Sequence, residues 1–195
     1  CALATPVGGA IGIIRLSGSN ALEITDKVFT RNSSTLSQYC LKEAKPNTIH
    51  YGVLHDMDGH DIDDVVVLVF KSPHSYTGED ATEICCHGSQ YILQQVLHTL
   101  IVAGARQAEP GEYTKRAYLN GKLDLSQAEA VADLISASNR ATHQMALSQL
   151  KGHFSSELSK LREQLLKMTS LLELELDFSD HEELEFADRG ELKDL

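Results

Sequence analysis

The sequence contains no run of about 18 apolar residues, so no segment is long enough to span a membrane as a helix. Its first six residues, CALATP, lack the basic start and long apolar stretch of a secretion signal. No methionine begins the chain and no closing element ends it, which suggests a fragment of a longer reading frame. We therefore expect part of a cytoplasmic protein with no membrane partner.

Cysteines are few, at positions 1, 40, 85 and 86, and no C-x-x-C pattern occurs. Cys85 and Cys86 are adjacent, and adjacent side chains of a strand point to opposite faces, so they cannot easily hold one metal ion. The spacing does not resemble a disulfide framework either. We expect reduced thiols, as is usual in the cytosol, and no metal site.

Nucleophile, zinc-protease and phosphate-loop patterns are also missing. There is no G-x-S-x-G and no H-E-x-x-H. The pair Gly121-Lys122 is followed by Leu123, and Arg116 occupies the place of the first glycine of a P-loop. This chain alone is therefore not expected to bind or hydrolyse a nucleoside triphosphate, and we assign it no catalytic residue.

The charge is unbalanced, with 17 Lys and Arg against 28 Asp and Glu and a formal net charge of −11. Residues 173–188 hold eight of the acids and no Lys or Arg, and the remainder of the chain is near neutral. A broad basic surface that follows phosphates is therefore not expected here. The acidic tract is typical of a solvated helix end and loop.

Proline occurs only at positions 6, 46, 73 and 110, and the last 85 residues contain four glycines. This shift predicts a mixed α/β part followed by a helical part, with a boundary near 111–125. Four segments have the β-branched or alternating pattern of strands. They are 10–16, 48–55, 61–70 and 80–87. Helical spacing is found in 17–29, 89–103, ended by Gly104, and 110–119.

The segment 56–60, DMDGH, lies between two predicted strands, and its Asp-Gly pair predicts a hairpin turn. Its acids also invite comparison with a calcium loop. That loop needs a third acid before the glycine and a Glu six residues after it, and both are absent. A hairpin is therefore the preferred interpretation.

The helical part opens with a capping-box pattern, in which Ser126 would cap the helix and the Glu129 side chain would accept a hydrogen bond from the Ser126 amide. Helical spacing then continues to Leu150. From Phe154 to Leu172 the apolar residues step by four and three, which makes a two-heptad seam. The seam fits an intramolecular core better than a dimer face, and Gly152 fits either a helix break or a kink.

Three groups of residues could carry a binding site. Three glycines in positions 8–12 allow either close approach of a ligand or a tight turn and a packed strand. Arg15 is the only charge in an apolar strand, and Glu83 is a carboxylate among the uncharged residues 81–86. A carboxylate in such a place needs a partner, which could be a structural cation or the adjacent N–H donors of a pterin. The cluster 110–125 adds three cations, either ligands or members of an exposed helix face. They are Lys115, Arg116 and Lys122.

The run 110–135, PGEYTKRAYLNGKLDLSQAEAVADLI, resembles the signature of the MnmE (TrmE) family of tRNA-modification GTPases. The segments GGAIGIIRLSG, SYTGEDATEICCHG and ELELDFSDHEELEF resemble the same family in the same order. The resemblance covers the whole chain. It implies an α+β fold. Residues 1–117 would form a mixed α/β folate-binding and dimerisation domain, similar to the folate domain of the glycine-cleavage aminomethyltransferase. Residues 118–195 would form the first part of a helical-bundle domain.

The resemblance also implies a function. In that family a tetrahydrofolate, 5-formyltetrahydrofolate or 5,10-methylenetetrahydrofolate, supplies one carbon for carboxymethylaminomethyl-type modification at C5 of the wobble uridine of tRNA. The protein forms a homodimer, works with the flavin-dependent partner MnmG, and hydrolyses GTP with Mg²⁺ and K⁺ in a separate domain. The folate contacts of the family fall on Arg15, Glu83 and Lys122 of this sequence.

Two departures and two alternatives accompany this interpretation. The GTPase domain is not in the sequence, and the glycine-rich stretch PVGGA is shorter and less basic than the common family form. One alternative is a stand-alone folate-dependent aminomethyltransferase, for which His87 and Asp80 are the only local acid–base candidates. The other is a dimerisation scaffold whose folate site is vestigial.

Overall fold

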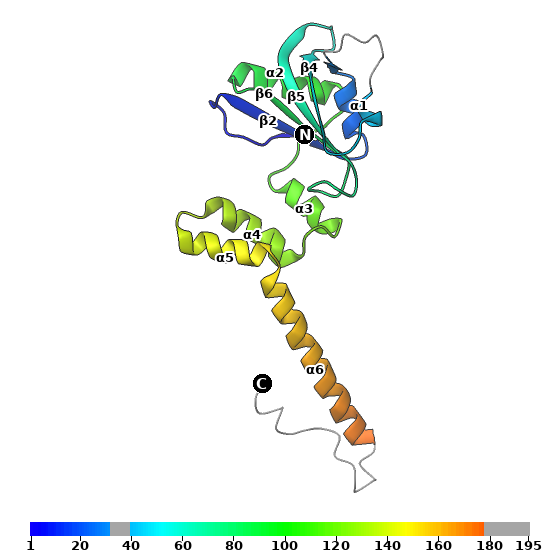
Figure 1. Ribbon diagram of the computed structural model, residues 1–195, viewed down its shortest axis with the longest axis vertical. Helices are drawn as coiled ribbons and strands as arrows, with labels where there is room; N and C mark the ends of the chain where they lie inside the picture. Colours follow the sequence, from blue (N-terminus) through cyan, green and yellow to red (C-terminus); the bar gives the residue numbers. More distant parts are fainter. Residues whose placement is uncertain (32–39, 178–195) are drawn as a thin grey trace. The chain divides into compact units, whose positions relative to one another are not determined.

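The computed structural model describes residues 1–31 and 40–177, which divide into two compact units that meet between Leu123 and Asp124. The first unit combines a sheet with helices and the second is helical, so the predicted α+β class is confirmed (Figure 1). The boundary expected after residue 117 falls inside helix α3, Glu112–Leu119. The acidic tract lies partly outside the described residues, from 178 onward.

The first unit is built on a sheet of six antiparallel strands in the order β1-β2-β6-β5-β4-β3. The strands are β1 Ala2–Leu3, β2 Ile11–Ser17, β3 Phe29–Arg31, β4 Thr48–His55, β5 Asp61–Phe70 and β6 Ala81–His87. The four predicted strands are confirmed within one residue at each end. The predicted hairpin is confirmed as well, because β4 and β5 pair directly across the turn at Gly59.

The helix expected over 17–29 is too long. Helix α1 covers only Ala21–Asp26, and the last residues of the expected helix turn into strand β3. Phe29 is buried and pairs with Leu54 of β4, and this tertiary pairing outweighs the local helical spacing. The 3-10 turn η1, Leu41–Glu43, then leads to β4.

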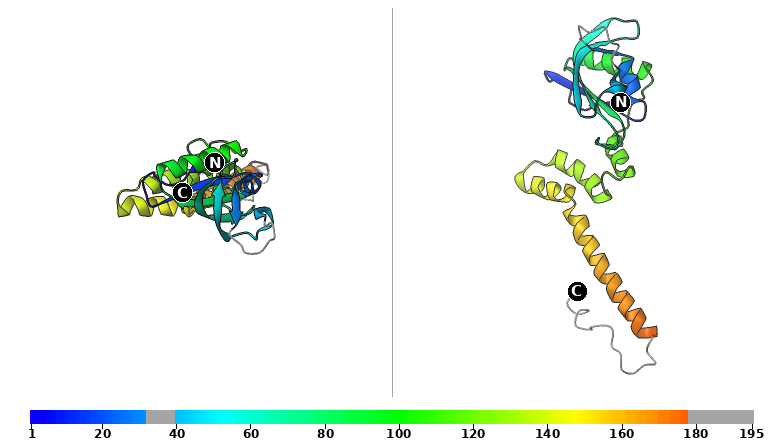
Figure 2. Two further views of the ribbon diagram at one scale, coloured as in Figure 1. Left: turned by 90° about the horizontal axis from the view of Figure 1, so that it is seen from above. Right: turned by 45° about the vertical axis from the view of Figure 1, so that its right-hand side comes forward.

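One face of the sheet carries the core, covered by α1 and by helix α2, Gln90–Val102 (Figure 2). Alternate strand residues such as Ile14, Val67 and Ile84 are fully buried there against Leu22, Leu93 and other helix residues. Gly12 lies close to this contact, since a side-chain carbon added to it would overlap the end of the Leu93 side chain. This supports the packed-strand interpretation of the glycine cluster.

The opposite face of the sheet is covered by neither α1 nor α2. Residues of alternate parity point to it, and several apolar ones are exposed, including Ile11, Ile49 and Tyr51. Arg15 and Glu83 belong to this face. A side chain here can meet a ligand without opening the core.

The second unit begins with helices α4, Leu125–Ser136, and α5, Arg140–Leu150. The predicted capping box is wrong by two residues. The cap is Asp124, whose carboxylate accepts from the Gln127 amide at 2.8 Å, while the Gln127 side chain accepts from the Asp124 amide at 2.9 Å. Asp caps a helix as well as Ser does, and a Gln side chain can accept the reciprocal hydrogen bond as Glu does. The helix therefore begins after Asp124, at the D-x-x-Q pair.

The helical spacing that continues to Leu150 does not reveal a break after Ser136. After this break Asn139 caps α5, because its side chain accepts from the Thr142 amide. Gly152 separates α5 from α6, His153–Asp177, and its φ of 80° is a left-handed conformation that ends the helix. Five of the six seam residues of α6 are exposed, for example Phe154 at 55% and Leu165 at 53%, and Met168 is half-buried, so no core among the described residues covers the seam. Among the helices of 1–31 and 40–177, none is long and apolar enough to cross a membrane.

Candidate functional site

Arg15 and Glu83 meet on the open face of the sheet. They are directly opposite in the register of β2 and β6, and Arg15 Nε donates to Glu83 Oε1 at 2.6 Å. The side chains remain 44% and 23% exposed. Strand pairing therefore brings together two charges that are 68 positions apart in the sequence.

This ion pair lies at the wall of a cavity of about 100 Å³. Three aromatic side chains line the same cavity, Phe70 at the end of β5, Tyr76 in the β5–β6 loop and Tyr113 of α3. The remaining lining comes from Leu16 and from small residues of β2, β6 and the β5–β6 loop. Aromatic walls beside a few charged groups are the usual make-up of a site for a flat organic ligand.

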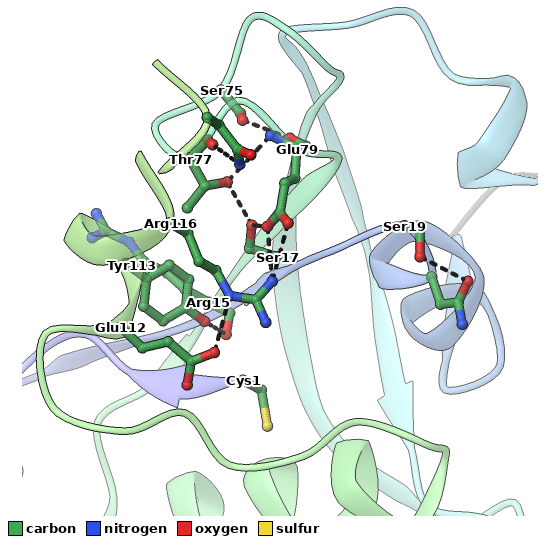
Figure 3. Close-up of polar contacts among 12 residues, drawn as sticks. Cys1, Arg15, Ser17, Ser19, Ser75, Thr77, Glu79, Glu112, Tyr113 and Arg116 are labelled. Carbon is green, nitrogen blue, oxygen red and sulfur yellow. Dashed lines mark hydrogen bonds and ion pairs between the residues drawn. The ribbon is translucent and has the colours of Figure 1, made fainter. Parts of the chain in front are cut away.

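Tyr113 connects helix α3 to the ion pair. Its hydroxyl donates to the backbone oxygen of Arg15 at 2.6 Å (Figure 3). Burial raises the pKa of Tyr113 to about 12, so the phenol keeps its proton at neutral pH. Tyr76 is held close by, with its hydroxyl 3.0 Å from the Thr114 hydroxyl of the same helix.

Lys122 does not reach this cavity. Its ammonium group donates to the backbone oxygen of Pro73 at 3.0 Å, and its side chain packs against Gly78. Both contacts are with the loop that supplies Tyr76 to the cavity wall. Of the three expected ligand residues, the structure joins Arg15 to Glu83 and places Lys122 against that loop, outside the cavity lining.

A network of ion pairs adjoins Tyr113. Arg116 Nη1 donates to Glu79 at 2.9 and 3.2 Å, and its Nε donates to Glu112 at 2.9 Å (Figure 3). Glu112 also accepts from Arg106, and the pair is bidentate. The hydrogen bonds from Arg106, from the Glu109 amide and from Arg116 lower the pKa of Glu112 to about 2. The hydrogen bond to Glu79 raises the pKa of Arg116.

A second cavity, of about 290 Å³, lies against this network and shares Leu16, Ser17 and Tyr113 with the first. It is bordered by two carboxylates, of Glu79 and Glu112, and by two guanidinium groups, of Arg106 and Arg116, and these side chains pair with one another. Each of these charged groups is already bound to another member of the network, so among these side chains the larger cavity offers no free charge to a ligand. The smaller cavity combines three aromatic walls with a partly exposed ion pair, so it is the better candidate.

Two further polar groups lie elsewhere. Asp56, Asp58 and His60 gather on the β4–β5 turn, where Asp56 accepts from the backbone amides of the other two residues. That is ordinary turn bonding. His87 donates its amide to Asp63 and lies 2.7 Å from it through Nδ1, and Asp80 accepts from the Ser72 amide. Neither His87 nor Asp80 lines the cavity at Arg15.

The sequence did not point to Tyr76 and Tyr113 as site residues. A signal was present for Tyr113, because it lies three positions before Arg116 and therefore shares its helix face. Arg116 itself was weighed as an exposed cation, yet it is only 29% exposed and bound to two carboxylates. The identity of its partners depends on tertiary contacts that residue spacing does not reveal.

Fold and site together define a class: an antiparallel sheet domain with a small aromatic-lined cavity on its open face, followed by a helical unit. The chain belongs to the MnmE (TrmE) family. Residues 1–122 match the family model described as the N-terminus of the GTP-binding protein TrmE, and residues 125–195 match the model of the MnmE helical domain.

Individual relatives agree with the family models. The chain is 58% identical over 195 residues to a protein of Bacteroides fragilis named tRNA modification GTPase MnmE, and 53% identical over 195 residues to the protein of that name from Flavobacterium johnsoniae. It is 52% identical over 223 aligned positions to the one from Phocaeicola vulgatus. Each match covers all of this chain but only 41%, 41% and 45% of the relative. The chain thus spans less than half the length of these relatives.

Proposed function

We propose that this chain is the folate-binding and dimerising part of a protein that modifies tRNA. Its sheet domain would present a tetrahydrofolate one-carbon donor for C5 modification of the wobble uridine, together with the flavin-dependent partner MnmG. GTP hydrolysis would belong to a separate domain, since no phosphate-loop pattern occurs in this sequence. The proposed setting is the cytoplasm, and the proposed assembly is a homodimer through the sheet domain.

The observation that carries the folate proposal is the Arg15–Glu83 pair inside an aromatic-lined cavity. Arg15 occupies Glu83 Oε1, and Oε2 has no hydrogen-bond partner among the residues that the structure describes. A pterin offers adjacent N–H donors to such a carboxylate, and its flat ring suits walls made of Tyr76, Phe70 and Tyr113. Lys122, next to the loop, would meet the part of the ligand outside the cavity.

The size of the cavity fits this division. A volume of about 100 Å³ is below the roughly 300–1,000 Å³ that encloses a whole drug-sized ligand. The cavity would therefore take one edge of the ring and leave the glutamate tail outside.

The test is calorimetric titration of the intact protein with 5-formyltetrahydrofolate. Arg15→Ala and Glu83→Ala should each weaken binding about tenfold or more, the equivalent of roughly 1.5–3 kcal/mol for a charged hydrogen bond. Lys115→Ala is the matched control, because Lys115 is an exposed cation of α3 that does not line this cavity. Unchanged affinity in both site variants would refute the assignment.

The same titration tests the scaffold alternative, and the geometry bears on the aminomethyltransferase. A wild-type dimer that gives no heat of binding would favour the scaffold. The aminomethyltransferase needs an acid or base at the ligand, and the structure engages His87 with Asp63 and Asp80 with a backbone amide, away from the cavity lining. The geometry of the cavity therefore does not favour the aminomethyltransferase.

A further inference from the structure

The loop that joins β5 to β6, residues 71–80, forms one wall of the Arg15–Glu83 cavity through Ser75, Tyr76 and Thr77. It contains no helix or strand. Fixing the backbone of such a segment costs conformational entropy, so the few hydrogen bonds within the loop need support from contacts with the rest of the domain.

Those contacts come from α3 and the turn after it. Arg116 binds the carboxylate of Glu79, the Asn120 side-chain amide donates to the backbone oxygen of Thr77 at 2.7 Å, and Lys122 donates to that of Pro73. Gly78, between these points, lies against the side chains of Asn120 and Lys122. We call this set of contacts the clasp.

Arg116 is the strongest member of the clasp by chemistry and by position. Both oxygens of Glu79 accept from one of its nitrogens, and the two side chains are each 29% exposed, so water screens the pair less than it screens a surface pair. Glu79 in turn accepts from Ser17 on β2 at 2.9 Å. The Ser17 hydroxyl also lies 2.6 Å from that of Thr77, which is 1% exposed. Arg116 thereby ties helix, loop and sheet together beside the cavity.

We propose that Arg116 is a positioning residue, which sets ligand affinity by holding the 71–80 loop closed against α3 without touching the ligand. It does not line the smaller cavity, whereas the residues it fixes, Tyr76 and Thr77 through the loop and Tyr113 through its own helix, do. The proposal rests on ligand binding at Arg15 and Glu83.

The expected size of the effect follows from population arithmetic. A ligand that requires the closed loop has an apparent Kd equal to the intrinsic Kd divided by the closed fraction. If loss of Arg116 leaves the loop closed about one-tenth of the time, affinity falls about tenfold. Contacts to the ring from Arg15 and Glu83 are unchanged in such a variant.

The experiment compares Arg116→Gln with Arg106→Gln in the intact protein, with 5-formyltetrahydrofolate as the probe. Both changes remove a cation bound to Glu112, but only the first releases Glu79. We expect Arg116→Gln to bind about tenfold more weakly, with a faster dissociation rate, and Arg106→Gln to bind as the wild type does. Arg116→Lys, which keeps the charge, should recover part of the loss.

A role limited to stability would lower the melting temperature of Arg116→Gln and leave its affinity and dissociation rate as in the wild type, and that result would overturn the proposal. If Arg116→Gln fails to fold, Asn120→Ala removes a neutral contact of the same loop and should weaken binding in the same direction. Equal affinity of a folded Asn120→Ala protein would then count against the clasp. Absence of binding by the wild type would instead reject the folate assignment itself.

Discussion

The two units treat the same kind of sequence pattern in opposite ways. In the first, the apolar residues of α2 such as Leu93, Val96 and Leu100 are almost completely buried against the sheet. In the second, five of the six seam residues of α6 are 41–55% exposed, among them Phe154, Leu158 and Leu161. The buried residues of its two preceding helices are both alanines, Ala130 and Ala146.

The comparison teaches that periodicity fixes the face of a helix and not the surface that covers it. Residue spacing of three and four is clear in α2 and α6 alike. The sheet supplies a partner for α2, so its face becomes core. The preference for an intramolecular core along α6 is not met by the described residues, and the stripe from Phe154 to Leu172 requires a surface to cover it.

The largest expected effect contrasts one leucine from each unit. Leu100→Ala in the buried face of α2 should lower the free energy of unfolding of the sheet unit by about 2–5 kcal/mol, because it leaves a cavity in a closed core. Leu161→Ala on α6 should change the free energy of unfolding of the helical unit by less than about 0.5 kcal/mol. Urea unfolding of the two variants, followed by circular dichroism, measures both values.

The contrast would fail if both leucines cost the same. A large loss from Leu161→Ala would mean that the α6 stripe is packed in solution, and analytical ultracentrifugation of that variant would then show whether a second copy supplies the packing. Val102→Ala, at an apolar residue of α2 that is 56% exposed, controls for the change in helix propensity that a substitution to alanine brings.

A middle-sized effect tests how the helical unit begins. Asp124→Ala removes the cap of α4 and should destabilise that unit by about 1 kcal/mol, visible as lost helical signal on heating. Glu129→Ala is the matched control, because Glu129 would be the partner of Ser126 in the capping box expected from the sequence. This variant should leave the helical signal unchanged. Equal losses from the two variants would restore the sequence-based cap.

A smaller effect is expected in acid and is confined to the sheet unit. The pKa of Glu112 is about 2 in the folded protein and rises to its ordinary value near 4.5 on unfolding. Its ion pairs thus stabilise the fold fully above about pH 4.5, and this stabilisation is lost as pH falls toward 2. Melting temperature measured against pH should fall less steeply in Glu112→Gln than in the wild type. Identical slopes would show that Glu112 is unpaired in solution.

The smallest effect concerns neighbouring thiols on the two faces of one strand. Cys86 points into the core and is 4% exposed, and burial raises its pKa to about 11, whereas Cys85 lies on the open face. Iodoacetamide should modify Cys85 before Cys86, as peptide mass spectrometry would show, with no change in the fold. Modification of Cys86 first would contradict the assignment of faces.

Much of the fold was predictable from local pattern. The strands 48–55 and 61–70 match β4 and β5 residue for residue, because alternation and the Asp-Gly turn both specify them. The misplaced features have one cause in common. Strand β3, the break after Ser136 and the Asp124 cap each depend on a partner residue that competes with the one the sequence pattern suggests. Residue spacing alone does not tell which of the two partners is used.

The candidate site was predictable in part. Arg15 and Glu83 stood out as single charges in apolar strands, and their meeting follows once β2 and β6 pair in register. Tyr76, Tyr113 and the contacts of Arg116 could not be derived, because they depend on how a loop without regular structure folds back on α3. The match of the chain to its family does not decide the role of Lys122, which remains a prediction.

The pairing of β2 with β6 has a consequence for thermal shift assays. A ligand that engages both Arg15 and Glu83 grips two central strands at once, so it can bind only molecules in which that pairing is complete. By mass action, a free ligand concentration one hundred times the dissociation constant stabilises the folded state by about 2.7 kcal/mol. The melting temperature of the sheet unit should therefore rise with ligand concentration, while the melting temperature of the helical unit does not change.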